Sequence, residues 1–396
     1  MAEVIADILT LVTKHEEWRG KNCVNLVPSE NVMSPHVRGL LSSELAHRYT
    51  SPDRFYMGTR FIDEIQHLGE EIARSLFKAE VADIRPLSGH VADWIFLANL
   101  TQRGDTLMCV SAKDGGYPGL WKRGLPKYLG LTLVAFPFSK GEMRIKTEEA
   151  KTAIIETKPK AIVFGASLFL FPHPVRELTK VAKEVNATVG FDGSHVMGLI
   201  AGKEFQSPLQ EGASVLFGST HKTFFGPQGG IILANKECGK ILKGKIYPAF
   251  VDNAHWNRIA ALTLALAEME KFGRAYARQV IRNARALGRT LHEFGFPTVG
   301  SSLGYTRSHQ ILLNYGGYKQ GCEVAKRLEN ANIITDCGVR LGTCEMTRRG
   351  MKEAEMEQIA ELIKRIVIDR ESPKKVKEEV ARLAHGFQEV GYCFAP

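Results

Sequence analysis

Short apolar runs alternate with helical stretches through the first two thirds of the chain. Between the runs, apolar residues recur at helical spacing, as they do in 61–76. The runs themselves are too short for typical helices and predict buried strands. They occupy residues 106–110, 131–136, 161–165, 187–191, 213–218 and 231–234. Apolar strands separated by helices indicate an α/β fold class with a large mixed, mainly parallel sheet.

The two ends of the chain differ from this middle part. The N-terminal segment predicts an amphipathic helical arm, because its apolar residues fall on one stripe. These residues are Ile5, Ile8, Leu9 and Val12. After a long helical stretch at 256–294, shorter strands and helices predict a smaller unit. We therefore expect an arm at 1–24, a large domain at 25–275 and a small C-terminal domain at 276–396.

Composition places the chain among ordinary globular proteins. Its 396 residues, 44% hydrophobic and 24% charged, are enough for two domains and a large core. No apolar run approaches the roughly 20 residues of a membrane span, and no basic region precedes an apolar one as in a secretory signal. The 7 cysteines include no Cys-x-x-Cys pair. This odd, scattered set predicts free thiols and a cytoplasmic location without a membrane partner.

The net charge of +9 raises the question of a nucleic-acid partner. Proteins that bind nucleic acid concentrate their positive charge in a stripe or patch. Here lysine and arginine are spread among acids, as in 374–379, which predicts a solvated surface and no nucleic-acid partner. Part of the excess can serve a phosphate or a carboxylate, since both attract positive residues.

Two polar segments at strand ends carry the strongest chemical signal. Lys222 follows one apolar run and precedes another, so it lies in a loop between two buried strands. Upstream, Asp192 stands at the end of a further apolar run. A lysine and an aspartate in this arrangement suit pyridoxal 5'-phosphate. The amine forms a Schiff base with the aldehyde, and the carboxylate keeps the pyridine nitrogen protonated, which makes the ring an electron sink.

These motifs belong to an ordered set that resembles the serine hydroxymethyltransferase family, pyridoxal-phosphate enzymes that interconvert serine and glycine. The family's lysine motif matches 220–230, with Gln228 in place of an arginine. Its aspartate motif matches 192–199, and its C-terminal Gly-hydrophobic-Arg-hydrophobic-Gly-Thr…Thr-Arg-Arg-Gly matches 338–350. Further matches keep the family's order and lie at 28–31, 85–89 and 165–167.

The resemblance implies the aspartate-aminotransferase-like fold type I, with a large cofactor domain and a smaller C-terminal α+β domain. It also implies a small amino-acid substrate and a homodimer whose active sites use residues from both chains. The cofactor-binding residues it predicts are Ser88, Gly89, His90, Tyr117, Ser167, Asp192, His195, Ser219, His221 and Lys222. The catalytic residues it predicts are Lys222, Asp192, His195, Tyr49 and Tyr56. For the substrate it predicts Arg340, Ser29 and Tyr56, and it implies no metal.

Several of these residues also have simpler interpretations. Ser88-Gly89 opens a predicted helix, whose first N–H groups suit a phosphate, but the serine could simply cap the helix. Arg340 suits a carboxylate as a bidentate fork, although a surface ion pair is the alternative. Tyr49 and Tyr56 match tyrosines that reach the neighbouring subunit, and core packing is the alternative for both.

The chain departs from the family in the parts devoted to folate. The family's glutamate after the first tyrosine is absent from 49–53, the loop before Gly338 is short, and 252–257 replaces a Gly-Gly-Pro turn. Tyr117 replaces a histidine over the ring, and His90 replaces a small residue. Two activities remain open: serine–glycine interconversion with tetrahydrofolate or another pterin, and a pterin-independent aldolase or aldol transferase on threonine-like or α-substituted serine substrates. A non-catalytic cofactor-binding regulator is a third possibility.

Overall fold

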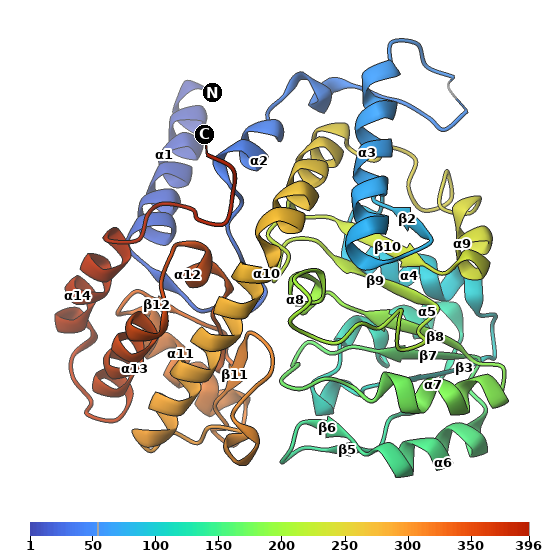
Figure 1. Cartoon of the computed structure of the whole chain (residues 1–396). Coiled ribbons are helices and arrows are strands. Elements are labelled where there is room, and N and C mark those ends of the chain that lie inside the picture. Colours follow the sequence, from blue (N-terminus) through green and yellow to red (C-terminus); the bar gives the residue numbers. More distant parts are fainter. Residues whose placement is uncertain (54, 396) are drawn as a thin grey trace. The chain divides into compact units, whose positions relative to one another are not determined.

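The computed structural model describes residues 1–53 and 55–395 (Figure 1). Its contacts divide the chain into two compact units. The first, here called the terminal unit, comprises Met1–Glu30 and Gln279–Gly391. The second, the sheet unit, comprises Asn31–Arg278 and Tyr392–Pro396. The N-terminal segment therefore groups with C-terminal residues, while the domain bounds expected from the sequence stay a prediction.

A seven-stranded sheet forms the centre of the sheet unit, in the order β2-β10-β9-β8-β7-β3-β4 (Figure 1). Its strands are β2 (Val81–Asp83), β3 (Thr106–Cys109), β4 (Thr132–Ala135), β7 (Ala161–Phe164), β8 (Thr188–Asp192), β9 (Val215–Ser219) and β10 (Gly230–Ala234). From β9 to β4 the neighbours are parallel, whereas β10 is antiparallel to both β9 and β2. Every apolar run expected to form a strand does so, and the mainly parallel sheet is confirmed.

Helices connect and cover these strands. In the sheet unit they are α2 (Pro35–Leu40), α3 (Arg60–Phe77), α4 (Gly89–Leu100), α5 (Leu125–Leu129), α6 (Thr147–Thr157), α7 (Val175–Glu184), α8 (Met197–Ala201) and α9 (Lys236–Lys243). Most are amphipathic, as in α7, which buries Val175, Leu178 and Ala182. By contrast, α4 is apolar almost all round and packs on β8, β9 and β10, and every residue of the short α8 is buried. A small antiparallel hairpin joins β5 (Phe138–Ser139) to β6 (Arg144–Ile145).

The long helix α10 (Trp256–Glu293) runs through the division between the units, which falls after Arg278. The terminal unit contains two small sheets, β1 (Val24–Asn25) parallel to β12 (Ile333–Ile334) and β11 (Gln310–Leu312) antiparallel to β13 (Arg340–Gly342). Its other helices are α1 (Ala2–His15), the π-helix Glu16–Lys21, α11 (Tyr318–Glu329), α12 (Cys344–Arg348), α13 (Glu353–Val367) and α14 (Pro373–His385). The apolar faces of α11, α13 and α14 form one core around Leu26, Leu341 and Ile359.

The cysteines differ from expectation at one pair. Cys322, near the start of α11, forms a disulfide with Cys337, in the turn before β13, so the prediction of free thiols is wrong for these two. The fold brings their Cα atoms to 4.1 Å across 15 positions of sequence. Their spacing in the sequence could not show this, because it depends on how α11 packs. The free cysteines are Cys23, Cys109, Cys238, Cys344 and Cys393. Among the residues described, no helix has the length and apolar character to cross a membrane.

Candidate functional site

Asp192 and the segment that carries Lys222 lie at one edge of the central sheet. Asp192 is the last residue of β8, and Lys222 follows the end of the neighbouring parallel strand β9. The carboxyl ends of parallel strands meet at the same sheet edge, where α/β folds place their ligand sites. The Asp192 side chain is buried, and its Oδ1 accepts the N–H of Ser194 at 2.9 Å, which fixes the direction of the carboxylate.

The loop around Lys222 is held by its own backbone and by neighbouring polar side chains. The carbonyl oxygen of Lys222 accepts Nδ2 of Asn31 at 2.7 Å. On either side of it, the hydroxyl of Thr220 donates to the Pro227 carbonyl at 2.8 Å, and that of Thr223 accepts the Gly198 N–H at 2.9 Å. The loop therefore presents the lysine from a fixed backbone between β9 and β10.

The N-terminus of α4 packs against this edge. Ser88 is the N-cap and accepts the N–H of Val91 at 3.1 Å. A Cβ on Gly89 would lie 2.8 Å from the Ser219 nitrogen and 3.0 Å from the Ser194 hydroxyl, so this close approach requires glycine. The Ser88 side chain therefore caps the helix, and phosphate binding by the first N–H groups of α4 stays a prediction.

His90 and Tyr117, where the chain departs from the family, lie together in the structure. The Tyr117 hydroxyl is 3.1 Å from Nδ1 of His90, and the two rings meet edge to face at 5.9 Å. Burial most of all, and to a smaller extent the nearby acids Asp93 and Asp192, raise the pKa of Tyr117 to about 12. The phenol is therefore neutral at ordinary pH and remains able to stack on a ring.

Buried polar atoms without partners mark the same edge. Among the residues described, Oγ of Ser219 and Nδ1 of His221 are buried and have no hydrogen-bond partner. Burial, and secondarily the charge of Lys222, lower the pKa of His221 to about 4, so its imidazole is neutral. Buried polar groups are normally paired, so these atoms point to a polar ligand or ordered water.

The remaining predicted cofactor residues, Ser167 and His195, also lie beside Asp192. His195 is buried on the segment between β8 and α8. Ser167 follows Gly165, which has a φ of +114°, and a Cβ on this glycine would lie 2.2 Å from the Asp192 carbonyl oxygen. The segment that follows β7 therefore lies directly beside the end of β8, its parallel neighbour in the sheet.

Tyr49 and Tyr56 form a separate pair. Their rings meet edge to face at 5.0 Å, and with exposures of 37% and 40% neither is packed in the core. The Tyr49 hydroxyl donates to Asp252, and this bond above all raises the pKa of Tyr49 to about 12. Asp53 accepts from the Ser51 hydroxyl and from the Phe55 N–H, so it stabilises its own turn. Exposure of both tyrosines argues against the core-packing alternative.

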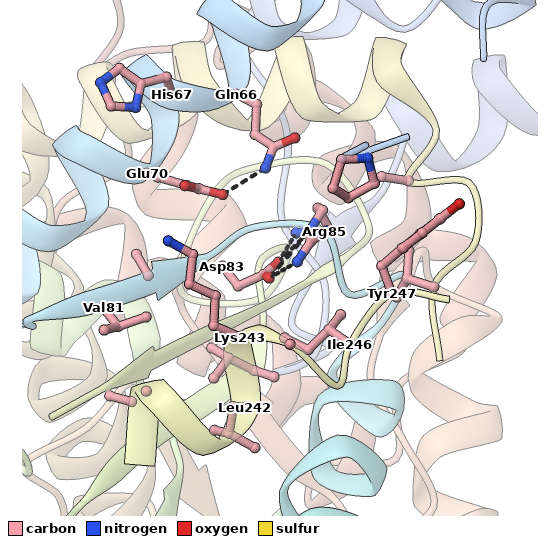
Figure 2. A pocket seen from close by; sticks show the side chains of 18 of the residues that line it. Gln66, His67, Glu70, Val81, Asp83, Arg85, Leu242, Lys243, Ile246 and Tyr247 are labelled. Atoms are coloured by element: carbon pink, nitrogen blue, oxygen red, sulfur yellow. Dashed lines mark hydrogen bonds and ion pairs between the residues drawn. The ribbon is translucent and has the colours of Figure 1, made fainter. Parts of the chain in front are cut away.

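Asp252 also lines a cavity of about 920 Å³ between α3, β2 and α9 (Figure 2). Inside it, Asp83 and Arg85 form a bidentate pair with nitrogen–oxygen distances down to 2.5 Å, and Gln66 donates to Glu70 at 2.7 Å (Figure 2). Asp83 and Arg85 thus satisfy one another, and Glu70 is held by a neutral amide. Two atoms of cavity-lining residues, Oγ1 of Thr50 and Nε1 of Trp256, are also buried without a partner among the residues described, so such atoms do not distinguish the cavity from the Lys222 edge. The cavity is the weaker cofactor candidate because Asp83, at the end of β2, is already paired with Arg85.

Within the terminal unit, Arg340 and Ser29 lie on adjoining segments. Arg340 begins β13, and a Cβ on Gly342 of the same strand would lie 2.4 Å from Cα of Pro28, the residue before Ser29. Nε of Arg340 donates to Oδ2 of Asp336 at 2.9 Å. The ion pair left open by the sequence therefore exists, within the turn that precedes the strand.

Asp93, on α4, is a residue whose position the sequence motifs did not single out. Its side chain is fully buried, and neither of its carboxyl oxygens has a hydrogen-bond partner among the residues described. An acid inside an otherwise apolar helix was the available signal, because a solvated helix face would surround such a residue with polar neighbours.

The chain is similar to known proteins along almost its whole length. The family model for serine hydroxymethyltransferase matches residues 3–363. The serine hydroxymethyltransferase of Methanocaldococcus jannaschii is 44% identical over 96% of this chain and 94% of its own length. That of Pyrococcus furiosus is 40% identical over 98% of this chain and 96% of its own.

Among solved structures, the L-threonine transaldolase from Pseudomonas fluorescens, in its internal aldimine state, is similar with a TM-score of 0.92 and 26% identity. The match covers 99% of this chain and 94% of that one. It confirms the fold type I class expected from the motifs, and the family model confirms the resemblance. The chain belongs to the serine hydroxymethyltransferase family.

Proposed function

We propose that the protein is a pyridoxal-phosphate enzyme that breaks or forms the Cα–Cβ bond of β-hydroxy amino acids. The observation that carries the proposal is the edge where Asp192, the Lys222 loop and the N-terminus of α4 meet. The orphaned atoms of Ser219 and His221 at this edge suit a polar ligand. Family membership supports the same conclusion, and the intact lysine and aspartate argue against a regulator without catalytic activity.

The residues present fit the cofactor. Lys222 would carry its aldehyde carbon, Asp192 would face the ring nitrogen, and the first turn of α4 with Ser219 would bind the phosphate. When bound, the cofactor supplies an electron sink for the electrons of the broken bond. The Ser194 N–H orients Asp192 for this role, and Tyr117 offers a neutral phenol to the ring. His195 would approach the phenolic oxygen of the cofactor, as the family resemblance implies.

Arg340 would bind the substrate carboxylate, with Ser29 on the adjoining segment and Tyr56 as further substrate contacts. A planar guanidinium offers a carboxylate two parallel hydrogen bonds. The bond from its Nε to Asp336 fixes the plane of the group before the substrate arrives.

Within the family, we propose that cleavage does not require tetrahydrofolate. Asp53 is engaged in its own turn and does not replace the missing glutamate, and Asp252 of the altered turn holds Tyr49. Similarity to a threonine transaldolase supports an aldolase or aldol transferase. Folate-dependent serine–glycine interconversion is the second candidate. It is favoured by the relatives from Methanocaldococcus jannaschii and Pyrococcus furiosus, which are named serine hydroxymethyltransferase.

We also propose a homodimer with shared active sites. The apolar stripe on α1 is more than half exposed in the single chain at each of its positions: Ile5, Ile8, Leu9 and Val12. A stripe of this kind marks an interaction surface, and a second copy would cover it. Light scattering should give twice the chain mass, and Leu9→Glu should lower it. The expected cytoplasmic location stays a prediction.

Borohydride reduction tests the cofactor assignment. The purified protein should be yellow, and reduction followed by peptide mapping should fix the cofactor on Lys222. An adduct on another lysine, or no bound cofactor, would contradict the proposal.

A second assay separates the two activities. Glycine formation from serine, threonine and phenylserine should proceed at similar rates with and without tetrahydrofolate. If tetrahydrofolate greatly accelerates glycine formation from serine and folate binds tightly in calorimetry, folate-dependent serine–glycine interconversion would be the better assignment.

A further inference from the structure

Asp93 lies on the face of α4 that packs against the ends of β8 and β9. Gly89, one turn earlier on the helix, contacts Ser194 and Ser219. Phe96, three residues later, stacks on Phe217 with 4.9 Å between ring centroids. Because residues three and four apart share a helix face, Asp93 lies between these two contacts. The strand register pairs Phe217 with Asp192, so α4 places Asp93 over the part of the sheet that carries Asp192, and the charge of Asp192 acts on Asp93.

The two carboxyl groups have different surroundings. Asp192 accepts a backbone hydrogen bond from Ser194, whereas both oxygens of Asp93 are buried without a partner among the residues described. The titratable groups with an electrostatic effect on Asp93, or affected by it, are Asp192, Lys222, Cys109 and Tyr117. Among the elements packed on α4, β10 has no titratable group, and α9 carries Lys236, Glu237, Cys238, Lys240 and Lys243. Burial most of all, and then the Asp192 charge, raise the pKa of Asp93 well above its usual range, against the opposite effect of Lys222.

We propose that Asp93 and Asp192 are an electrostatically coupled acid pair that holds one proton, with the proton on Asp93 and the negative charge on Asp192, and with no hydrogen bond between the two carboxyls. Two adjacent buried carboxyls do not both ionise, because like charges repel strongly where water is excluded. The Ser194 N–H stabilises a charged Asp192, while a charged Asp93 would be buried without a hydrogen bond. The proton therefore resides on Asp93.

This pair makes Asp93 a positioning residue for the ring-nitrogen end of the cofactor site. As a neutral acid it leaves Asp192 as the one negative charge of the pair. It also remains able to ionise if Asp192 loses its charge. The inference rests on the proposed function, because it takes Asp192 as the partner of the cofactor nitrogen.

A double-mutant cycle on pyridoxal-phosphate affinity tests this dependence. Asp93→Asn keeps the charge of the pair, so binding should weaken by less than about threefold. In an Asp192→Asn background Asp93 can take over the charge, so there the same change should weaken binding by a further factor of about ten or more. A merely structural Asp93 would shift affinity equally in both backgrounds. The visible spectrum of the bound cofactor gives a second readout of the same cycle.

Infrared spectra of the cofactor-free protein report the proton directly. A protonated-carboxyl band should be present in the unmodified protein and absent in Asp93→Asn. Asp114→Asn is the matched control, because Asp114 is also buried but accepts the Ser111 hydroxyl at 2.5 Å and lies 3.7 Å from Nζ of Lys140. This control should keep the band.

The pH dependence of the free energy of unfolding gives an independent test of the Asp93 proton. A raised folded-state pKa means that stability is fully present below the unfolded pKa of aspartate and is lost as pH rises through the folded value. Asp93→Asn should therefore gain stability relative to the unmodified protein as pH rises. If Asp93→Asn fails to fold, Asp93→Ser supplies the same neutral comparison.

The outcomes separate the two proposals. Three outcomes would each overturn the acid pair. They are an equal effect of Asp93→Asn on cofactor affinity in both backgrounds, a protonated-carboxyl band that survives Asp93→Asn, and a stability difference between Asp93→Asn and the unmodified protein that does not change with pH. If the unmodified protein binds no pyridoxal phosphate, the proposed function fails, while the infrared and stability measurements on cofactor-free protein still decide the acid pair.

Discussion

Gly89→Ala tests whether the N-terminus of α4 is packed as closely as the proposed phosphate site requires. The added Cβ would lie 2.8 Å from the Ser219 nitrogen and 3.0 Å from the Ser194 hydroxyl. One of these contacts is backbone, so a side-chain rotation cannot relieve it. The first turn of α4 must move away from the end of β9.

The magnitude follows from two opposing effects. Overpacking of this kind costs about 1–3 kcal/mol, and alanine in place of glycine in a helix returns about 0.5–1 kcal/mol. We expect a net loss of about 1–2 kcal/mol in the free energy of unfolding. If the movement falls on the phosphate-binding N–H groups, affinity for pyridoxal phosphate should fall about tenfold.

The assay is thermal unfolding of the cofactor-free protein together with spectroscopic titration of pyridoxal phosphate. Gly39→Ala in α2 is the matched control, because a Cβ there meets nothing within 4 Å. This control should be neutral or stabilising by up to about 1 kcal/mol, with unchanged affinity. If Gly89→Ala kept both its stability and its affinity, the close approach of α4 to β9 would be refuted as the basis of the site.

Three further predictions concern the carboxylate site, acid stability and the disulfide. Arg340→Lys should weaken amino-acid binding by about 2 kcal/mol while cofactor affinity changes little, measured by titration of the cofactor band; equal amino-acid binding would make Arg340 structural. Burial lowers the pKa of His173 to about 3. Its contribution to stability is therefore present above the pKa of the unfolded state and is lost as pH falls from there toward the folded value of about 3. In His173→Gln, the free energy of unfolding measured with urea should therefore fall less steeply as the pH is lowered. An unchanged dependence on pH would contradict this assignment. Alkylation of unfolded, unreduced protein should modify Cys23, Cys109, Cys238, Cys344 and Cys393 but spare Cys322 and Cys337, and labelling of all seven would rule out the bond.

The large sheet and the edge that bears Lys222 followed from local sequence patterns. A strand buried on both faces must be apolar throughout, so each strand of the parallel sheet left a visible run. The same argument placed Asp192 and Lys222 at strand ends, since polar residues directly after such runs lie where the strands leave the core. Family motifs added the glycine that begins α4 and the arginine of β13, which no periodicity reveals.

Contacts between distant segments were decided only by the tertiary structure. The sequence left Arg340 open between a ligand fork and an ion pair, and the turn before β13 brought Asp336 to it. Tyr49 meets Asp252 across 203 positions, and the disulfide depends on how α11 packs. Sequence spacing carries no information about such distances.

Asp93 shows the difference most clearly. The sequence alone determined that an acid stands within an apolar helix. Only the packing of α4 on β8 and β9 decided that this acid is fully buried beside Asp192, without a partner among the residues described. Its protonation depends on the loss of water and on a second charge from another strand, and both exist only in the folded chain.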